Sequence, residues 1–143
     1  MQEHDKKITS VVHFIGVGAM GGPMAHRLLE GGHVVRVFDS NPQRVEAFGA
    51  QHGKHTELSL EQLGSEADYV VMILPNSGVV EEVLFGQNGL ASRLKKNAMI
   101  IDMTSGQPNT TLSMGQRLEA LNILFIDAPV SGAVPRAQNG TLT

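Results

Sequence analysis

The sequence contains no cysteine and no long run of basic or apolar residues. Disulfide bonds, a thiolate nucleophile and a cysteine-based zinc site are therefore excluded. With a net charge of −3 and no cluster of lysine or arginine, the chain is not expected to bind nucleic acid or an anionic membrane. No apolar stretch approaches the roughly 20 residues that cross a bilayer. We therefore expect a cytoplasmic protein.

A polar segment opens the chain, and the remainder has the composition of one globular domain. Residues 1–10 lack the apolar core of a secretion signal and are expected to form a short tail. Residues 11–143 suit a single domain in length and apolar content. The chain stops on a strand-like Thr-Leu-Thr after a loop rich in glycine, proline and small residues. We therefore expect a larger protein to continue past Thr143.

Short β-branched apolar runs alternate with helical patterns along the chain. Near-continuous apolarity is typical of parallel strands buried on both faces. The alternation predicts an α/β fold: a Rossmann-type, doubly wound, mainly parallel sheet with helices on both faces. The predicted strands are Val11–Val17, Val34–Asp39, Tyr69–Leu74, Ala98–Asp102 and Ile123–Asp127, with a weaker candidate at Lys54–Thr56.

The segments between the strands carry helical spacing and helix-start signals. Met20, Met24 and Leu28 recur every four residues and so share one helix face. Asparagine before proline caps a helix well, and Ser-x-x-Gln has the spacing of a capping box. The predicted helix starts are Asn41-Pro42, Ser59–Gln62, and Pro108 ahead of Leu112, Leu118 and Leu121.

A glycine-rich turn joins the first strand to the first helix. Gly16, Gly18 and Gly21 fit the pattern G-x-G-x-x-G. The first glycine permits a tight turn, the second lets a pyrophosphate approach the backbone, and the third lets helix and strand pack closely. The helix that follows offers unpaired N–H groups to the phosphates. Together these features predict a dinucleotide site, although the glycines could also serve the turn alone.

The second predicted strand ends in Asp39, 23 residues after Gly16. A carboxylate at this position can bind both hydroxyls of the adenosine ribose and repels a 2′-phosphate. This predicts NAD in preference to NADP. Two alternatives stay open: Asp39 could be a solvated strand-end carboxylate, and the nearby Arg36 or Arg44 could accept a 2′-phosphate.

Other chemistries find little support in the sequence. The six histidines show no metal-ligand spacing, so we predict no metal site. The absence of G-x-x-x-x-G-K excludes a nucleotide-hydrolysing loop. Ser131 has no adjacent base motif and is a poor nucleophile. Asp102 and Asp127 end strands, where carboxylates usually bind the following turn.

Four stretches of the chain resemble the β-hydroxyacid dehydrogenases, a family that includes 3-hydroxyisobutyrate dehydrogenase and tartronate semialdehyde reductase. They occur in the family's order and at its spacing. They are FIGVGAMGGPMAHRLLEGGHVVRVFD (14–39), MILPNSGVVEEVLFGQNGL (72–90), IIDMTSGQPNTT (100–111) and DAPVSGAVPRAQNGTLT (127–143).

The resemblance implies two sets of binding residues. The substrate carboxylate would be held by Ser131, Gly132 and Ala133, where the family usually has Gly-Gly after the serine. The methyl group of Ala133 would narrow the substrate pocket or strain a backbone with positive φ. The implied cofactor-binding residues are Gly16, Gly18, Ala19, Met20, Gly21, Asp39, Ser40, Leu74, Pro75, Val79 and Ser105.

The resemblance also implies an activity, and it implies that the catalytic residue for this activity lies outside the sequence. The full protein would be an NAD-dependent oxidoreductase that transfers a hydride between NAD and a small 3-hydroxy acid, or the matching semialdehyde. It is expected to be a homo-oligomer. The family's catalytic lysine lies beyond Thr143, and neither Lys95 nor Lys96 matches its motif, so we assign no catalytic residue here and expect an inactive fragment. The alternatives are a non-catalytic NAD sensor and a 6-phosphogluconate dehydrogenase-like enzyme.

Overall fold

Five parallel strands form a single sheet in the computed structural model, which describes residues 9–143. The polar tail predicted over residues 1–10 therefore lies outside the described residues, apart from Thr9 and Ser10. The strand order is β2-β1-β3-β4-β5, with every neighbouring pair parallel. The strands are β1 (Val11–Ile15), β2 (Val34–Phe38), β3 (Tyr69–Met72), β4 (Met99–Asp102) and β5 (Leu124–Asp127).

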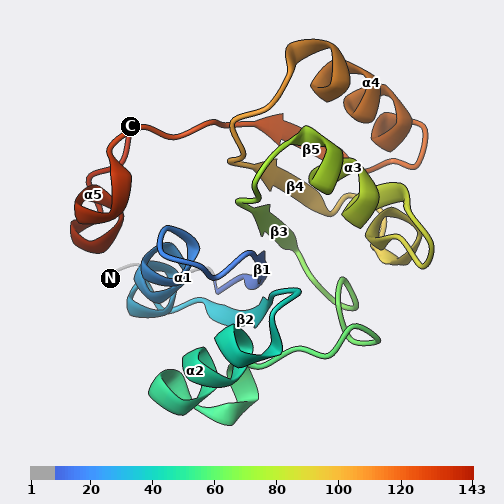
Figure 1. The fold of residues 1–143 in the computed structure, drawn as a ribbon. Helices are drawn as coiled ribbons and strands as arrows, with labels where there is room; N and C mark the ends of the chain where they lie inside the picture. The colour runs from blue at the N-terminus through green and yellow to red at the C-terminus, as the bar shows by residue number, and fades with distance from the viewer. Residues whose placement is uncertain (1–8) are drawn as a thin grey trace, which may run out of the picture.

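Helices follow the strands and cover both faces of the sheet (Figure 1). Within residues 9–143, no helix is both long enough and apolar enough to cross a membrane. The helices are α1 (Gly21–Glu30), α2 (Pro42–His52), α3 (Ser77–Phe85), α4 (Pro108–Glu119) and α5 (Ala133–Asn139), with short 3₁₀ turns η1 (Lys54–Thr56) and η2 (Leu90–Arg93).

Each face of the sheet has its own apolar core. On one face, Phe14 and Val37 pack with Ala25 of α1 and Phe48 of α2. On the other face, strand residues such as Ile100 pack against α3 and α4. Alternate strand residues thus enter opposite cores, which is why the strands are apolar almost throughout. The predicted Rossmann-type architecture is confirmed.

Two of the three predicted helix starts are confirmed. The Asn41 side chain accepts the N–H of Gln43 at 3.0 Å, with Pro42 in the first turn of α2. Pro108 begins α4, where Leu118 is fully buried. Leu112 and Leu121 were expected beside it, but both are exposed and Leu121 lies past the helix end.

The remaining two local predictions were wrong. Lys54–Thr56 is a 3₁₀ turn instead of a strand, because Gly53 has a φ of +108° and the Thr56 hydroxyl donates to its carbonyl. Ser59 and Gln62 do form reciprocal capping hydrogen bonds. No helix follows, since Gly64 and Glu66 both adopt positive φ and the segment stays a series of turns.

Strand β5 forms one edge of the sheet, beyond β4. Its outward side chains are apolar: Leu124 is 52% exposed and Ile126 is 43% exposed. The alternate residue Phe125 is half-buried and packs against the core beneath α4. The edge strand is therefore covered on one face only.

Candidate cofactor site

The glycine turn between β1 and α1 is held by two steric constraints. Gly16 has a φ of +96°, and a Cβ there would lie 2.2 Å from the carbonyl oxygen of Ile73. A Cβ on Gly21 would lie 1.7 Å from the carbonyl oxygen of Gly16. No real side chain tolerates either approach. These two glycines are therefore required for the close packing of β1, β3 and α1.

Gly18 differs from its two neighbours in the motif. Among residues 9–143, a Cβ there would meet only the Arg44 guanidinium, with 3.4 Å to Nη1. Packing therefore does not require a glycine at position 18. The bare main chain of Gly18 instead lines the space where a ligand would approach. The start of α1 has no side-chain cap and no acidic residue in its first turn. Pro23 has no N–H, and the N–H of Gly22 donates to the Gly18 carbonyl at 3.0 Å. The Gly21 N–H and the positive end of the helix dipole are therefore what this turn offers an anion.

Asp39 ties the end of β2 to the glycine turn. Its Oδ2 accepts the N–H of Val17 at 3.0 Å, and its Oδ1 accepts the N–H of Asn41 at 2.9 Å. The carboxylate is buried. Because each carboxylate oxygen can accept more than one hydrogen bond, Asp39 can support the turn and still receive ribose hydroxyls.

A chain of two hydrogen bonds through the buried Thr104 supports the opposite wall. The N–H of Leu74 donates to Oγ1 of Thr104 at 3.0 Å, and the N–H of Thr104 donates to Oδ1 of Asp102 at 3.0 Å. Thr104 is 1% exposed and Asp102 is 3% exposed. Burial raises the pKa of Asp102, and the negative charge of Asp127 raises it further, against the lowering effect of the bonds from Thr104. The carboxylates of Asp102 and Asp127 thus repel one another. Asp102 accepts a hydrogen bond from the turn that follows its strand, as predicted.

These features meet in one cavity of about 510 Å³ at the carboxyl ends of β1, β2 and β3. It contains every residue predicted for the cofactor except Ser105, which is exposed beside the buried Thr104 and does not line it. Five further residues line the cavity without having been assigned to it: Ile15, Phe38, Arg44, Ile73 and Val83. Val83 follows Val79 by one helical turn of α3, a spacing that could have identified it.

The sequence left open whether Arg36 or Arg44 could accept a 2′-phosphate, and the structure places the two side chains in different surroundings. Arg36 turns toward the segment after α2, where it donates to the carbonyls of His55 and Glu57. Arg44 lies beside Asp39, with 3.6 Å between Nη1 and Oδ2. Only Arg44 therefore reaches the cavity.

The predicted substrate residues lie outside this cavity: Ser131 and Gly132 are in the loop between β5 and α5, and Ala133 is the first residue of α5. Ser131 and Thr143 pair through both of their backbone groups, so the N–H of Ser131 is engaged within the chain. Gly132 has a φ of +132° and Ala133 a φ of +56°. Of the two consequences expected from a methyl group at position 133, the strained backbone is the one that the structure displays.

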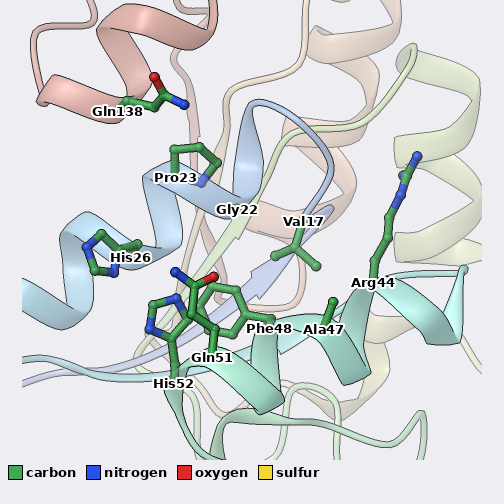
Figure 2. Close-up of a pocket in the computed structure, with 10 residues that line it drawn as sticks. All are labelled: Val17, Gly22, Pro23, His26, Arg44, Ala47, Phe48, Gln51, His52 and Gln138. Atoms are coloured by element: carbon green, nitrogen blue, oxygen red, sulfur yellow. The ribbon is translucent and has the colours of Figure 1, made fainter.

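A second cavity of about 440 Å³ lies on the other side of the turn, among α1, α2 and α5 (Figure 2). The rings of His26 and His52 lie 4.9 Å apart between centroids, and the Phe48 ring packs against His52 at 4.4 Å with the two planes tilted by 46°. Burial lowers the pKa of His52, and His26 adds to the effect. The sequence did not indicate this cavity, because its histidines come from different helices.

Fold and cavity together define a Rossmann-type domain of the dinucleotide-binding class. The family model described as the NAD binding domain of 6-phosphogluconate dehydrogenase matches residues 11–143. The chain belongs to this family.

Similar proteins are named as hydroxyacid dehydrogenases and aldehyde reductases. The chain is 40% identical over 132 residues to 2-(hydroxymethyl)glutarate dehydrogenase of Eubacterium barkeri. The aligned region covers 92% of this chain and 44% of that protein. The chain is 35% identical over 133 residues to 3-sulfolactaldehyde reductase of Escherichia coli, covering 93% and 44%. The chain thus spans less than half the length of these relatives.

A solved structure shows the same fold. The 3-hydroxyisobutyrate dehydrogenase of Mycobacterium tuberculosis, described with L-serine, superimposes with a TM-score of 0.84 at 29% identity. The match covers 94% of this chain and 45% of that one. The resemblance to this oxidoreductase family is therefore confirmed at the level of sequence and fold.

Proposed function

We propose that this chain is the NAD-binding part of an enzyme that transfers a hydride between NAD and a small 3-hydroxy acid or its semialdehyde. One observation carries the proposal: a single cavity joins the bare Gly18 main chain, the uncapped start of α1 and the Asp39 carboxylate. Amide donors for a diphosphate and an acceptor for ribose hydroxyls are the groups that a dinucleotide requires.

Each part of the cavity has a separate task in this proposal. The Gly21 N–H and the positive end of the α1 dipole bind the diphosphate, and Asp39 accepts the adenosine ribose hydroxyls. Leu74, Pro75 and Val79 form the apolar wall beside the adenosine. The bound nicotinamide would supply the hydride chemistry, and the protein contributes position and orientation.

The substrate loop is proposed to hold the carboxylate of the hydroxy acid through the Ser131 hydroxyl and the amides that follow. Proton exchange with the substrate oxygen needs a further group. Among the described residues, no lysine lines the cofactor cavity, and Lys95 pairs with Asp68 at the amino end of the sheet. Residues 1–143 alone are therefore expected to bind cofactor with little or no turnover.

Titration of the chain with NADH tests the proposal. Gly18→Ala places a methyl group where the diphosphate must approach while leaving the fold intact, so it should weaken NADH binding on the order of tenfold, or ~1.4 kcal/mol. Gly22→Ala is the matched control, because its Cβ would lie 3.6 Å from the Val17 carbonyl oxygen, an ordinary contact. Equal affinity in both variants, or no NADH binding by the parent chain, would refute the proposed site.

The choice of cofactor follows from Asp39. Its carboxylate should disfavour the 2′-phosphate of NADPH, so we expect NADH to bind more tightly. Parallel titrations with NADH and NADPH measure the preference. Tighter binding of NADPH would overturn the role given to Asp39.

A further inference from the structure

Arg44 occupies an unusual place between the two cavities. It lines both of them. Figure 2 shows its side chain rising from the first turn of α2, away from Gln51 and His52 at the other end of the same helix. Its Nη1 lies 3.6 Å from Oδ2 of Asp39 and would lie 3.4 Å from a Cβ on Gly18. The guanidinium therefore stands over the bare segment of main chain.

The stability of the domain does not account for this placement. Arg44 lies in the first turn of α2, where the helix dipole disfavours a cation. Its side chain is 55% exposed, and its ion pair with Asp39, at 3.6 Å, is longer than a hydrogen bond. The buried Asp39 carboxylate already accepts the backbone N–H groups of Val17 and Asn41, so it does not depend on this distant, half-exposed partner. The charge is thus weakly held and remains available to another anion.

We propose that Arg44 is a cofactor-binding residue whose guanidinium leaves Asp39 and binds the cofactor diphosphate when the dinucleotide enters. This inference rests on the proposed function, since it assigns a further residue to the same site. Two considerations support it. A diphosphate that approaches Gly18 enters the space beside the guanidinium, and the planar, forked donors of arginine match phosphate oxygens. Release of Arg44 also frees Oδ2 of Asp39 for a ribose hydroxyl.

The test compares four forms of the chain by NADH titration: the parent, Arg44→Gln, Arg44→Lys and Arg117→Ala. Arg117 lies on α4 over the Phe85 ring and has a similarly exposed side chain, so its removal controls for the loss of one positive charge. Arg44→Gln should weaken NADH binding about tenfold, a typical effect of losing one charge-assisted hydrogen bond. Arg44→Lys should recover part of the affinity, and Arg117→Ala should match the parent.

Titration with NADPH separates the diphosphate from the 2′-phosphate as the group that Arg44 binds. The proposal requires Arg44→Gln to weaken NADH and NADPH by similar factors. A loss confined to NADPH would place the guanidinium at the ribose and overturn the assignment. Unchanged or tighter NADH binding by Arg44→Gln would overturn it too, while leaving the proposed function intact. Absence of NADH binding by the parent chain would instead refute the proposed function itself.

Discussion

Thr104 holds Leu74 in place through one partly buried hydrogen bond, from the Leu74 N–H to the Thr104 Oγ1 at 3.0 Å. The bond links the turn after β4 to the apolar wall of the cofactor cavity after β3. Thr104→Val keeps the shape of the side chain but leaves this N–H without its acceptor, at a cost of about 1–3 kcal/mol. We expect a lower Tm and weaker NADH binding. Thr104→Ser retains the hydroxyl and should preserve both, and equal values for the two variants would show that the bond is unimportant.

Protonation of His13 should limit stability in mild acid. Its Nδ1 accepts the N–H of Gly64 at 3.0 Å, and burial together with the charge of Arg36 lowers its pKa to about 4. The unfolded chain takes up a proton near pH 6.5 and the folded chain near pH 4, so stability falls as the pH decreases across this window, by roughly 3 kcal/mol. Urea unfolding between pH 7 and pH 4 measures the loss. His13→Asn, which keeps an acceptor but cannot charge, should show a shallower slope.

Asp102 should make the opposite contribution. Because burial raises its pKa, the unfolded chain ionises first, and the stability contributed by Asp102 declines as the pH rises through its ordinary range. Asp102→Asn keeps an oxygen for the Thr104 N–H and carries no charge. The variant should therefore gain stability relative to the parent chain as the pH increases from 3 toward 7. A pH-independent difference in the unfolding free energy would contradict this expectation.

The alanine at position 133 carries a backbone strain that glycine would relieve. Its φ of +56° costs an L-residue about 1–2 kcal/mol, whereas glycine loses about 0.4–1 kcal/mol through the greater freedom of the unfolded chain. Ala133→Gly should therefore stabilise the domain by about 0.5 kcal/mol, measured as a higher midpoint in urea. Ala137→Gly in the same helix, where the residue is buried, should destabilise it by about 1 kcal/mol. A loss of stability in Ala133→Gly would show that the position is unstrained.

Local patterns were sufficient for the sheet and for the glycines and Asp39 of the proposed site. The β-branched runs, the glycine spacing and Asp39 at a strand end all depend on neighbours in sequence, and parallel strands bring their carboxyl ends to one edge. The cavity contains these glycines and Asp39, together with Leu74, Pro75 and Val79, which the resemblance to the family implied.

Features that depend on contacts between distant segments could not be predicted from the sequence. Thr104 and Ser105 both offered a hydroxyl, but the register of β4 turns Thr104 inward and leaves Ser105 exposed. The Ser59–Gln62 box satisfied its own hydrogen bonds, yet the positive φ of Gly64 prevented a helix. Arg36 and Arg44 were equivalent by position, and only the path of the chain after α2 drew Arg36 away.

The half-exposed apolar residues of β5 have a practical consequence for these measurements. An edge strand with outward-facing Leu124 and Ile126 offers its backbone to the same strand of another molecule, and edge pairing of this kind is a common route to aggregation. Affinities are best recorded in dilute samples checked by light scattering. A lysine at position 126 would provide a better-behaved parent for the variant series.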